Sequence, residues 1–151
     1  MKTLIGGLFI PGHPRPKGSL DVVNARRKVL ADSDESTTWR ALMAYKLRAE
    51  YAGAPPALGP VFVVADFLMP VSPEAVTTRQ VGDLDKLIRN LFDALADDPN
   101  PRKRKLVSGV IKDDSQVVSV KATMRSCRDG IPGALARPSG VYVAAYELED
   151  W

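Results

Sequence analysis

Residues 84–95 carry apolar side chains at the spacing of an α-helix with one buried face, and this segment constrains the fold most. The pattern is i, i+3, i+4, i+7, i+8 and i+11, and the residues are Leu84, Leu87, Ile88, Leu91, Phe92 and Leu95. The other face carries Asp85, Lys86, Arg89, Asn90 and Asp93. Because such a helix must bury its apolar stripe against a sheet or another helix, the segment predicts a layered domain.

Runs of β-branched and aromatic residues predict strands on both sides of this helix. They span residues 4–10, 61–69, 116–124 and 140–148. A second helix is expected from about Ser36 to Tyr51, with Trp39, Leu42, Met43 and Leu47 on its apolar stripe. Prolines and glycines predict a loop over residues 11–18, and residues 71–82, 97–105 and 128–140 are also expected to be loops. The order β, α, β, α, β, β predicts an α+β fold, a small mixed sheet of about four strands with two main helices packed on it.

The composition favours one globular domain over residues 1–151. Hydrophobic residues make up 45% of the chain and charged residues 26%, as in ordinary globular proteins. The 21 Lys and Arg residues against 18 Asp and Glu residues give a net charge of +3, too small to indicate a polyanionic partner by itself. The single Cys127 excludes an internal disulfide framework, and no apolar run approaches the ~20 residues of a membrane span. We expect a cytoplasmic protein that does not bind a membrane.

Two pairs of carboxylates stand at the ends of predicted elements. Asp83 and Asp85 flank the first residue of the patterned helix, and Asp113 and Asp114 precede the third predicted strand. Mg²⁺ prefers oxygen ligands and usually takes one or two protein carboxylates, with water and substrate phosphate completing its shell. With Asp83 as the helix cap, the side chains of Asp83 and Asp85 can turn to one side. One of Asp113 and Asp114 is expected to join them, if the strand lies beside the N-terminal end of the helix.

Each carboxylate pair also has an ordinary structural explanation. An Asp at a helix cap accepts hydrogen bonds from free backbone N–H groups, and acidic residues in the first turn complement the helix dipole. An Asp-Asp pair before a strand commonly belongs to a turn. These roles do not explain why both pairs stand beside many cations, so the pattern favours a site for a metal ion and a phosphate.

Several cations are candidates for contact with a nucleic acid. Lys86 and Arg89 share a helix face beside the first carboxylate pair, where either can contact a scissile phosphate. The alternative for Arg89 is an ion pair with Asp85, worth only about 0.3–0.5 kcal/mol when exposed. The run from Arg102 to Lys105 either binds backbone phosphates or is an ordinary solvated loop. The full set is Arg15, Lys17, Arg79, Lys86, Arg89, Arg102, Lys103, Arg104 and Lys105.

Three segments resemble the RusA family of Holliday-junction resolvases, endonucleases of bacteria and their phages. Residues 82–95, which begin Gly-Asp-Leu-Asp-Lys-Leu-Ile-Arg and end Asp-Ala-Leu, resemble the family's D-L-D-N-L-x-K…D-A-L helix. Residues 113–117, Asp-Asp-Ser-Gln-Val, resemble its D-D-x-Q-V element, and residues 11–18 resemble its proline-rich basic segment. These segments are a minor part of the chain, but their order and spacing extend over most of it.

The resemblance implies that Asp83, Asp85 and Asp114 occupy the family's metal-binding positions, with Asp113 as a neighbour. Arg89 stands where the family commonly has an essential Lys, and Lys86 stands where Asn is common. An Arg in place of a Lys keeps the positive charge but changes its geometry. The loop that follows the helix is longer than the resemblance leads us to expect, so its contacts with DNA are expected to differ.

The activity that the resemblance implies is Mg²⁺-dependent hydrolysis of a phosphodiester in branched double-stranded DNA, with Mn²⁺ as a substitute ion. The family acts as a homodimer, and two sites related by a two-fold axis suit symmetrical cutting of a four-way junction in recombination and repair. Two other classes stay open. A non-catalytic DNA-binding module would use the same cations. A Mg²⁺-dependent nucleotide phosphohydrolase would need a deep pocket, and the chain has no Gly-rich phosphate loop of the P-loop type.

Overall fold

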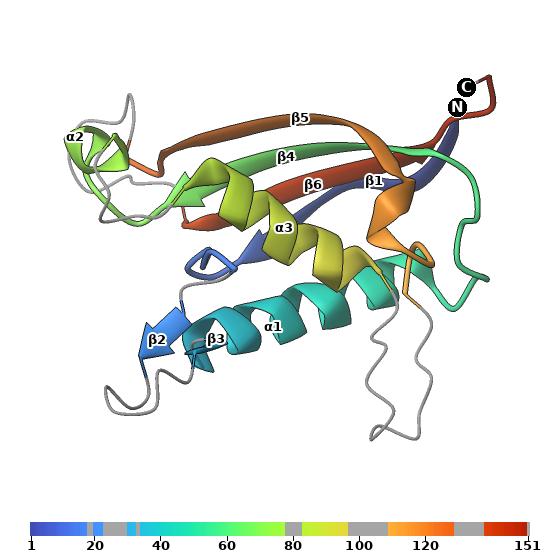
Figure 1. Cartoon of the computed structure of the whole chain (residues 1–151). Helices are drawn as coiled ribbons and strands as arrows, with labels where there is room; N and C mark the ends of the chain where they lie inside the picture. Colours follow the sequence, from blue (N-terminus) through green and yellow to red (C-terminus); the bar gives the residue numbers. More distant parts are fainter. Residues whose placement is uncertain are drawn as a thin grey trace.

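The computed structural model describes residues 1–17, 20–22, 30–32, 34–77, 83–96, 109–128 and 138–150. The protein has two layers, a four-stranded sheet and helices along one of its faces (Figure 1). The strands are β1 (Lys2–Pro11), β4 (Val61–Met69), β5 (Val117–Ser126) and β6 (Gly140–Glu147), in the order β1-β6-β4-β5. β4 and β5 run parallel, and the other neighbours run antiparallel. This mixed sheet confirms the predicted α+β fold.

The two main helices are α1 (Asp34–Tyr51) and α3 (Leu84–Leu95), as predicted. Both lie on the same face of the sheet in Figure 1. α1 packs on β1 and on α3, and α3 packs on β5. No helix within the described ranges is long and apolar enough to cross a membrane.

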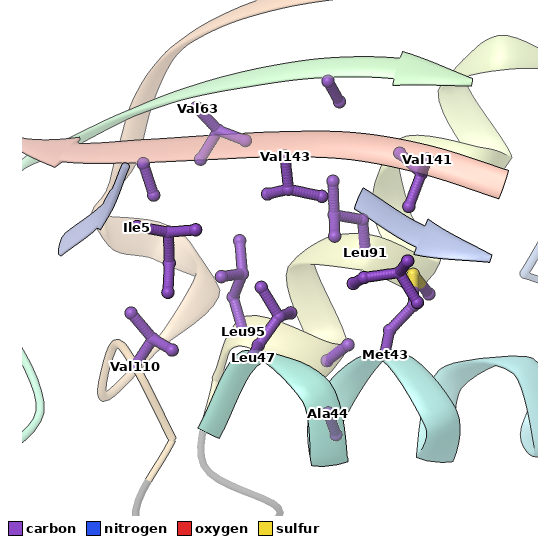
Figure 2. Close-up of a cluster of buried hydrophobic side chains, with 14 of the residues drawn as sticks. Ile5, Met43, Ala44, Leu47, Val63, Leu91, Leu95, Val110, Val141 and Val143 are labelled. Carbon is purple, nitrogen blue, oxygen red and sulfur yellow. The ribbon is translucent and has the colours of Figure 1, made fainter. Parts of the chain in front are cut away.

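The side chains of the two layers meet in one apolar core. Alternate residues of β4 face the helices, so Val61, Val63, Ala65 and Phe67 are all buried. Figure 2 shows this contact from the side; its labelled residues are Ile5, Met43, Ala44, Leu47, Val63, Leu91, Leu95, Val110, Val141 and Val143. Full burial of one aliphatic side chain stabilises a fold by about 1.5–3 kcal/mol. The core therefore holds α3, and the residues at its ends, in a fixed position on the sheet.

The buried face of α3 is rotated from the predicted stripe. Leu87 and Leu91 are fully buried, as expected, but Ile88 and Phe92 are only partly buried. Asn90, which was expected on the polar face, has no exposed surface. Because α3 packs against α1 as well as the sheet, its covered face extends around to position 90.

The elements that the sequence pattern missed are all short. β2 (Leu20–Val22) and β3 (Leu30–Asp32) form an antiparallel pair in a stretch without a clear period. α2 (Pro73–Val76) lies in a predicted loop, and the 3₁₀ turn η2 (Asp114–Gln116) precedes β5. Elements of three or four residues are too short to display a period of 2 or 3.6 residues.

Candidate metal and nucleic-acid site

The first carboxylate pair lies at the N-terminal end of α3. Asp83 has the extended backbone of an N-cap residue (φ −90°, ψ 142°), yet its side chain makes no capping hydrogen bond. One of its carboxylate oxygens lies 3.8 Å from the ammonium group of Lys86. Asp85 is in the first helical turn, and both carboxylates are exposed. Capping therefore does not account for the Asp83 side chain, whose oxygens are accessible to a cation.

The second pair begins η2, and its two carboxylates have different roles. The Asp113 carboxylate accepts a hydrogen bond of 2.8 Å from the backbone N–H of Ser115. That bond, with smaller contributions from the Ser115 and Asp114 side chains, holds the pKa of Asp113 below its ordinary value. Asp114 is exposed and takes no part in the cap. Asp113 is thus a structural residue, and Asp114 is the better candidate for a metal ligand.

Gln116 completes this turn and ties it to the rest of the fold. Its side-chain oxygen accepts hydrogen bonds from the N–H groups of Asp113 (2.8 Å) and Lys112 (2.9 Å). Its side-chain nitrogen donates to the carbonyls of Ala57 (2.8 Å) and Gly59 (2.9 Å). The turn and its Gln together form a capping box. The Asp-Asp-Ser-Gln sequence therefore holds the backbone at Asp114 in one conformation.

The two carboxylate pairs lie at opposite ends of α3. The N–H groups of Val110 and Ile111 donate to the carbonyl of Leu95 at 2.9 and 3.0 Å, so the chain returns beside the C-terminal end of the helix (Figure 1). The 12 residues of α3 extend over roughly 18 Å. β5 therefore starts beside the C-terminal end of the helix, and within one chain the condition for Asp113 or Asp114 to join the first pair is not met.

A physical reason for this placement is the parallel pairing of β5 with β4. Val117 aligns with Val61 at the start of β4, and a helix that connects two parallel strands must run in the opposite direction to them. The start of β5 consequently lies at the end of α3. Among the residues that the structure describes, no group of three His, Cys, Asp or Glu side chains could hold a metal ion.

The basic segment after β1 folds against α3. The N–H of Lys17 donates to the carbonyl of Lys86 at 3.0 Å, and the Lys17 ammonium pairs with the Asp93 carboxylate. The Arg15 guanidinium pairs with Glu35 at 3.1 Å. Two predicted DNA contacts, Arg15 and Lys17, are therefore held beside the helix that starts at the first carboxylate pair.

Gly12 allows this segment to pass closely over α1. Its φ of +148° is a conformation that L side chains rarely adopt, and a Cβ atom there would lie 2.6 Å from the buried ring of Trp39. His13 follows directly, and its pKa is lowered mainly by burial and also by the neighbouring Arg15. The segment is thus tightly packed, and at neutral pH its charge comes from Arg15 and Lys17.

Arg89 lies one turn beyond the first carboxylate pair and is exposed. Within the described ranges it forms no ion pair with Asp85 or with any other carboxylate, so the ion-pair alternative is not realised there. Lys86 is half-exposed beside Asp83. Both cations are thus placed where a phosphate bound near the N-terminal end of α3 would meet them.

Five predicted DNA contacts, Arg79 and residues 102–105, lie outside the described residues.

The sequence pattern did not predict a polar cluster that lies beneath the basic segment and is formed by Ser36, Arg40, Asn90 and Asp93. The amide of Asn90 bonds to Ser36, Arg40 and the backbone of Arg15. The only sequence signal for it was an Asn next to an apolar stripe.

Comparison with known proteins identifies the family. The family model described as endodeoxyribonuclease RusA matches residues 11–134, which include the basic segment, α3 and η2. No curated protein sequence gives a significant match to the chain. The matched region is well over half of the 151 residues. The chain therefore belongs to the RusA family of endodeoxyribonucleases.

Proposed function

We propose that this chain is a Mg²⁺-dependent endodeoxyribonuclease that resolves four-way DNA junctions by paired symmetrical nicks, as a homodimer, in DNA recombination and repair. Family membership supports the nuclease activity. The observation that carries the proposal is that Asp83 makes no capping bond and stands with Asp85, Lys86 and Arg89 at one helix end. Carboxylates for a metal ion and cations for a phosphate are needed together in such a site.

The donor atoms fit Mg²⁺, because Asp83 and Asp85 offer two exposed carboxylates, two residues apart, at one helix end. Mg²⁺ usually takes one or two such groups and keeps water and phosphate as its remaining ligands. When bound, the ion lowers the pKa of a coordinated water and polarises the phosphoryl oxygen. Asp114 is the third ligand in this proposal, since the Asp113 carboxylate already accepts a backbone hydrogen bond.

Arg89 and Lys86 act on the phosphate in this proposal. The planar guanidinium of Arg89 can donate two parallel hydrogen bonds to one phosphate. It would hold the scissile group and offset the negative charge that develops during attack. Lys86 lies on the same face of α3, one turn closer to the carboxylates, and contributes a second positive charge.

The dimer is what completes the site. Asp114 lies a helix length from Asp83 in one chain, and β5 runs back along α3 from the C-terminal end of the helix towards its start. A two-fold axis through the middle of β5 would bring Asp114 of the partner subunit towards Asp83 and Asp85. The same axis would produce two equivalent sites, as paired nicks require.

The exposed edge of β5 is suited to such an interface. β5 is the last strand in the order of the four-stranded sheet, so one row of its backbone groups has no neighbour within that sheet. Val118 and Val120 on this strand are 39% and 44% exposed. Ile88 and Phe92 of the adjoining α3 are only partly buried. Association of two copies along this edge would cover these apolar side chains.

The test is cleavage of a synthetic four-way DNA junction with Mg²⁺, comparing the wild type with Asp83→Asn. We expect paired symmetrical nicks from the wild type. The variant should lose cleavage but keep junction binding, because the substitution preserves size and removes a negative charge. Binding without cleavage by either protein, with Mn²⁺ also tried, would indicate a DNA-binding module. Turnover of free nucleotides in place of DNA would indicate the phosphohydrolase.

A further inference from the structure

We infer that Asn90 is a positioning residue, which fixes the basic segment of residues 11–17 to α3 and so places the cations of that segment for DNA contact. The inference rests on the proposed function for the role of those cations. Asn90 has no exposed surface although it lies in the middle of a helix. Its side chain joins α3 to two other parts of the chain, the basic segment and the first turns of α1.

Both ends of the Asn90 amide are used. The nitrogen Nδ2 donates to the backbone carbonyl of Arg15 at 3.0 Å. It also lies 3.2 Å from the carbonyl and 3.3 Å from the hydroxyl of Ser36. The oxygen Oδ1 accepts a hydrogen bond of 3.3 Å from the Arg40 guanidinium. A buried amide with this set of partners has one orientation, so the Arg15 backbone is held at one point on α3.

No apolar or charged residue could serve in its place. An Asn in a helix interior is less favourable than the Leu or Ala that would extend the apolar stripe. Leu at position 90 would leave the partly buried Arg15 carbonyl without its donor, and a carbonyl that is shielded from water and has no partner is costly. Asp would keep an acceptor for Arg40 but would turn a carboxylate oxygen towards the carbonyls of Arg15 and Ser36. The amide is the group that satisfies donors and acceptors at once.

The contact at Asn90 acts together with two others along the same face of α3. One turn towards the helix start, the carbonyl of Lys86 accepts the N–H of Lys17, and nearer the helix end Asp93 pairs with the Lys17 ammonium. The Asp93 contact involves a partly exposed ion pair and is weak, so a DNA phosphate can compete for Lys17. The Asn90 side chain has no exposed surface, so we expect its hydrogen bond to the Arg15 carbonyl to persist in that exchange. The segment therefore keeps its place on the helix that begins at Asp83 and Asp85.

The experiment measures junction affinity without Mg²⁺ over a range of salt concentrations. The slope of log affinity against log salt is negative, and each phosphate contact makes it steeper by about 0.9. Asn90→Leu removes no charge, yet we expect it to make the slope shallower by about one to two, because Arg15 and Lys17 lose their fixed positions. Arg15→Ala should make the slope shallower by about one in the wild-type background and should leave it unchanged in Asn90→Leu.

The matched control is Val63→Ala, a truncation in the core of β4 that is remote from the segment. It destabilises the fold but should leave the slope unchanged. If Asn90→Leu fails to fold, Asn90→Ala also removes the amide without changing the charge, and it is expected to make the slope shallower in the same way. An unchanged slope in the folded variants, or additive effects of the position 90 and Arg15 substitutions, would overturn the inference.

Hydrogen exchange at the Lys17 amide separates this inference from the proposed function. Asn90→Leu should accelerate exchange of this amide by at least tenfold relative to Val63→Ala, whether or not DNA is present. If the wild type bound no junction, the proposed function would fail, while faster exchange at Lys17 would still support the attachment of the segment by Asn90. Slow exchange at Lys17 in the variant would refute it.

Discussion

Mixing two inactive variants should restore cleavage, if the site is shared between two chains. In one chain Asp83 and Asp114 are separated by α3, roughly 18 Å for 12 residues. Two oxygen ligands of one Mg²⁺ lie at most about 4 Å apart, since each bond is 2.0–2.1 Å long. Rotation of the two side chains cannot close the difference between these two distances. Asp114 must therefore come from the second chain or have no part in the site.

The assay mixes Asp83→Asn with Asp114→Asn in equal amounts after subunit exchange. Half of the dimers are then mixed, and each mixed dimer has one intact site and one site with both substitutions. The mixture should therefore nick a four-way junction at about one quarter of the wild-type rate. Most products should be single nicks, because the second site in each dimer is inactive.

The matched control mixes Asp83→Asn with Asp85→Asn. Both residues belong to the same helix end, so each site of the mixed dimer still contains one substitution, and no activity should return. Absence of restored nicking in the first mixture, with exchange verified by mass spectrometry of labelled chains, would refute the shared site. Full activity of Asp114→Asn alone would show that this carboxylate is not needed.

Two further predictions concern the segments that hold the site. Asp113→Asn keeps the capping oxygen but removes the charge, and the low pKa of Asp113 sets the sign of the effect. At pH values above 3.8, the ordinary pKa of the group, the wild type should be more stable than this variant, and the difference should disappear as the pH falls below that value. Urea unfolding at pH 7 and pH 3 measures the difference in stability. A difference that does not depend on pH would contradict the reasoning. Gly12→Ala should cost about 1–3 kcal/mol, because of the positive φ and the contact with Trp39; thermal unfolding checks this, and a variant as stable as the wild type would refute it.

The sequence was sufficient for the long elements of the fold. The stripe of Leu87, Leu91 and Leu95 repeats over more than two turns, so its period identifies a helix that must lie against a sheet. The same holds for the alternating residues of β4. Three-residue strands such as β2 give no such signal, because pairing with a neighbour rather than periodicity creates them.

The site was harder to predict, because spacing along the chain does not reveal which end of a helix the chain returns to. Asp83 and Asp85 were expected at the start of α3 and lie there. Asp114 was expected beside them, but the parallel pairing of β4 and β5 places it at the other end. The burial of Asn90 depends on α1 and the basic segment, which are both remote in sequence. Contacts of that kind leave no local pattern.

We expect Lys86 to weaken the binding of a cation by the first carboxylate pair. Its ammonium lies 3.8 Å from the Asp83 carboxylate, at the position where the resemblance to the family leads one to expect Asn. An exposed pair of this kind is worth up to about 1 kcal/mol, and a metal ion must compete with it. Lys86→Asn should therefore raise Mn²⁺ affinity by up to about fivefold in calorimetric titrations without DNA, where a lost phosphate contact has no effect.

Lys46→Asn is the matched control, since it removes the same charge from an exposed position on α1. Its effect on Mn²⁺ affinity should be small and should vanish at high salt, where long-range electrostatics are screened. The Lys86 effect should largely persist, because the ammonium competes directly for the oxygens of Asp83. Weaker Mn²⁺ binding by Lys86→Asn, or equal effects of the two substitutions, would show that the Lys86 ammonium does not compete with a metal ion for the Asp83 carboxylate.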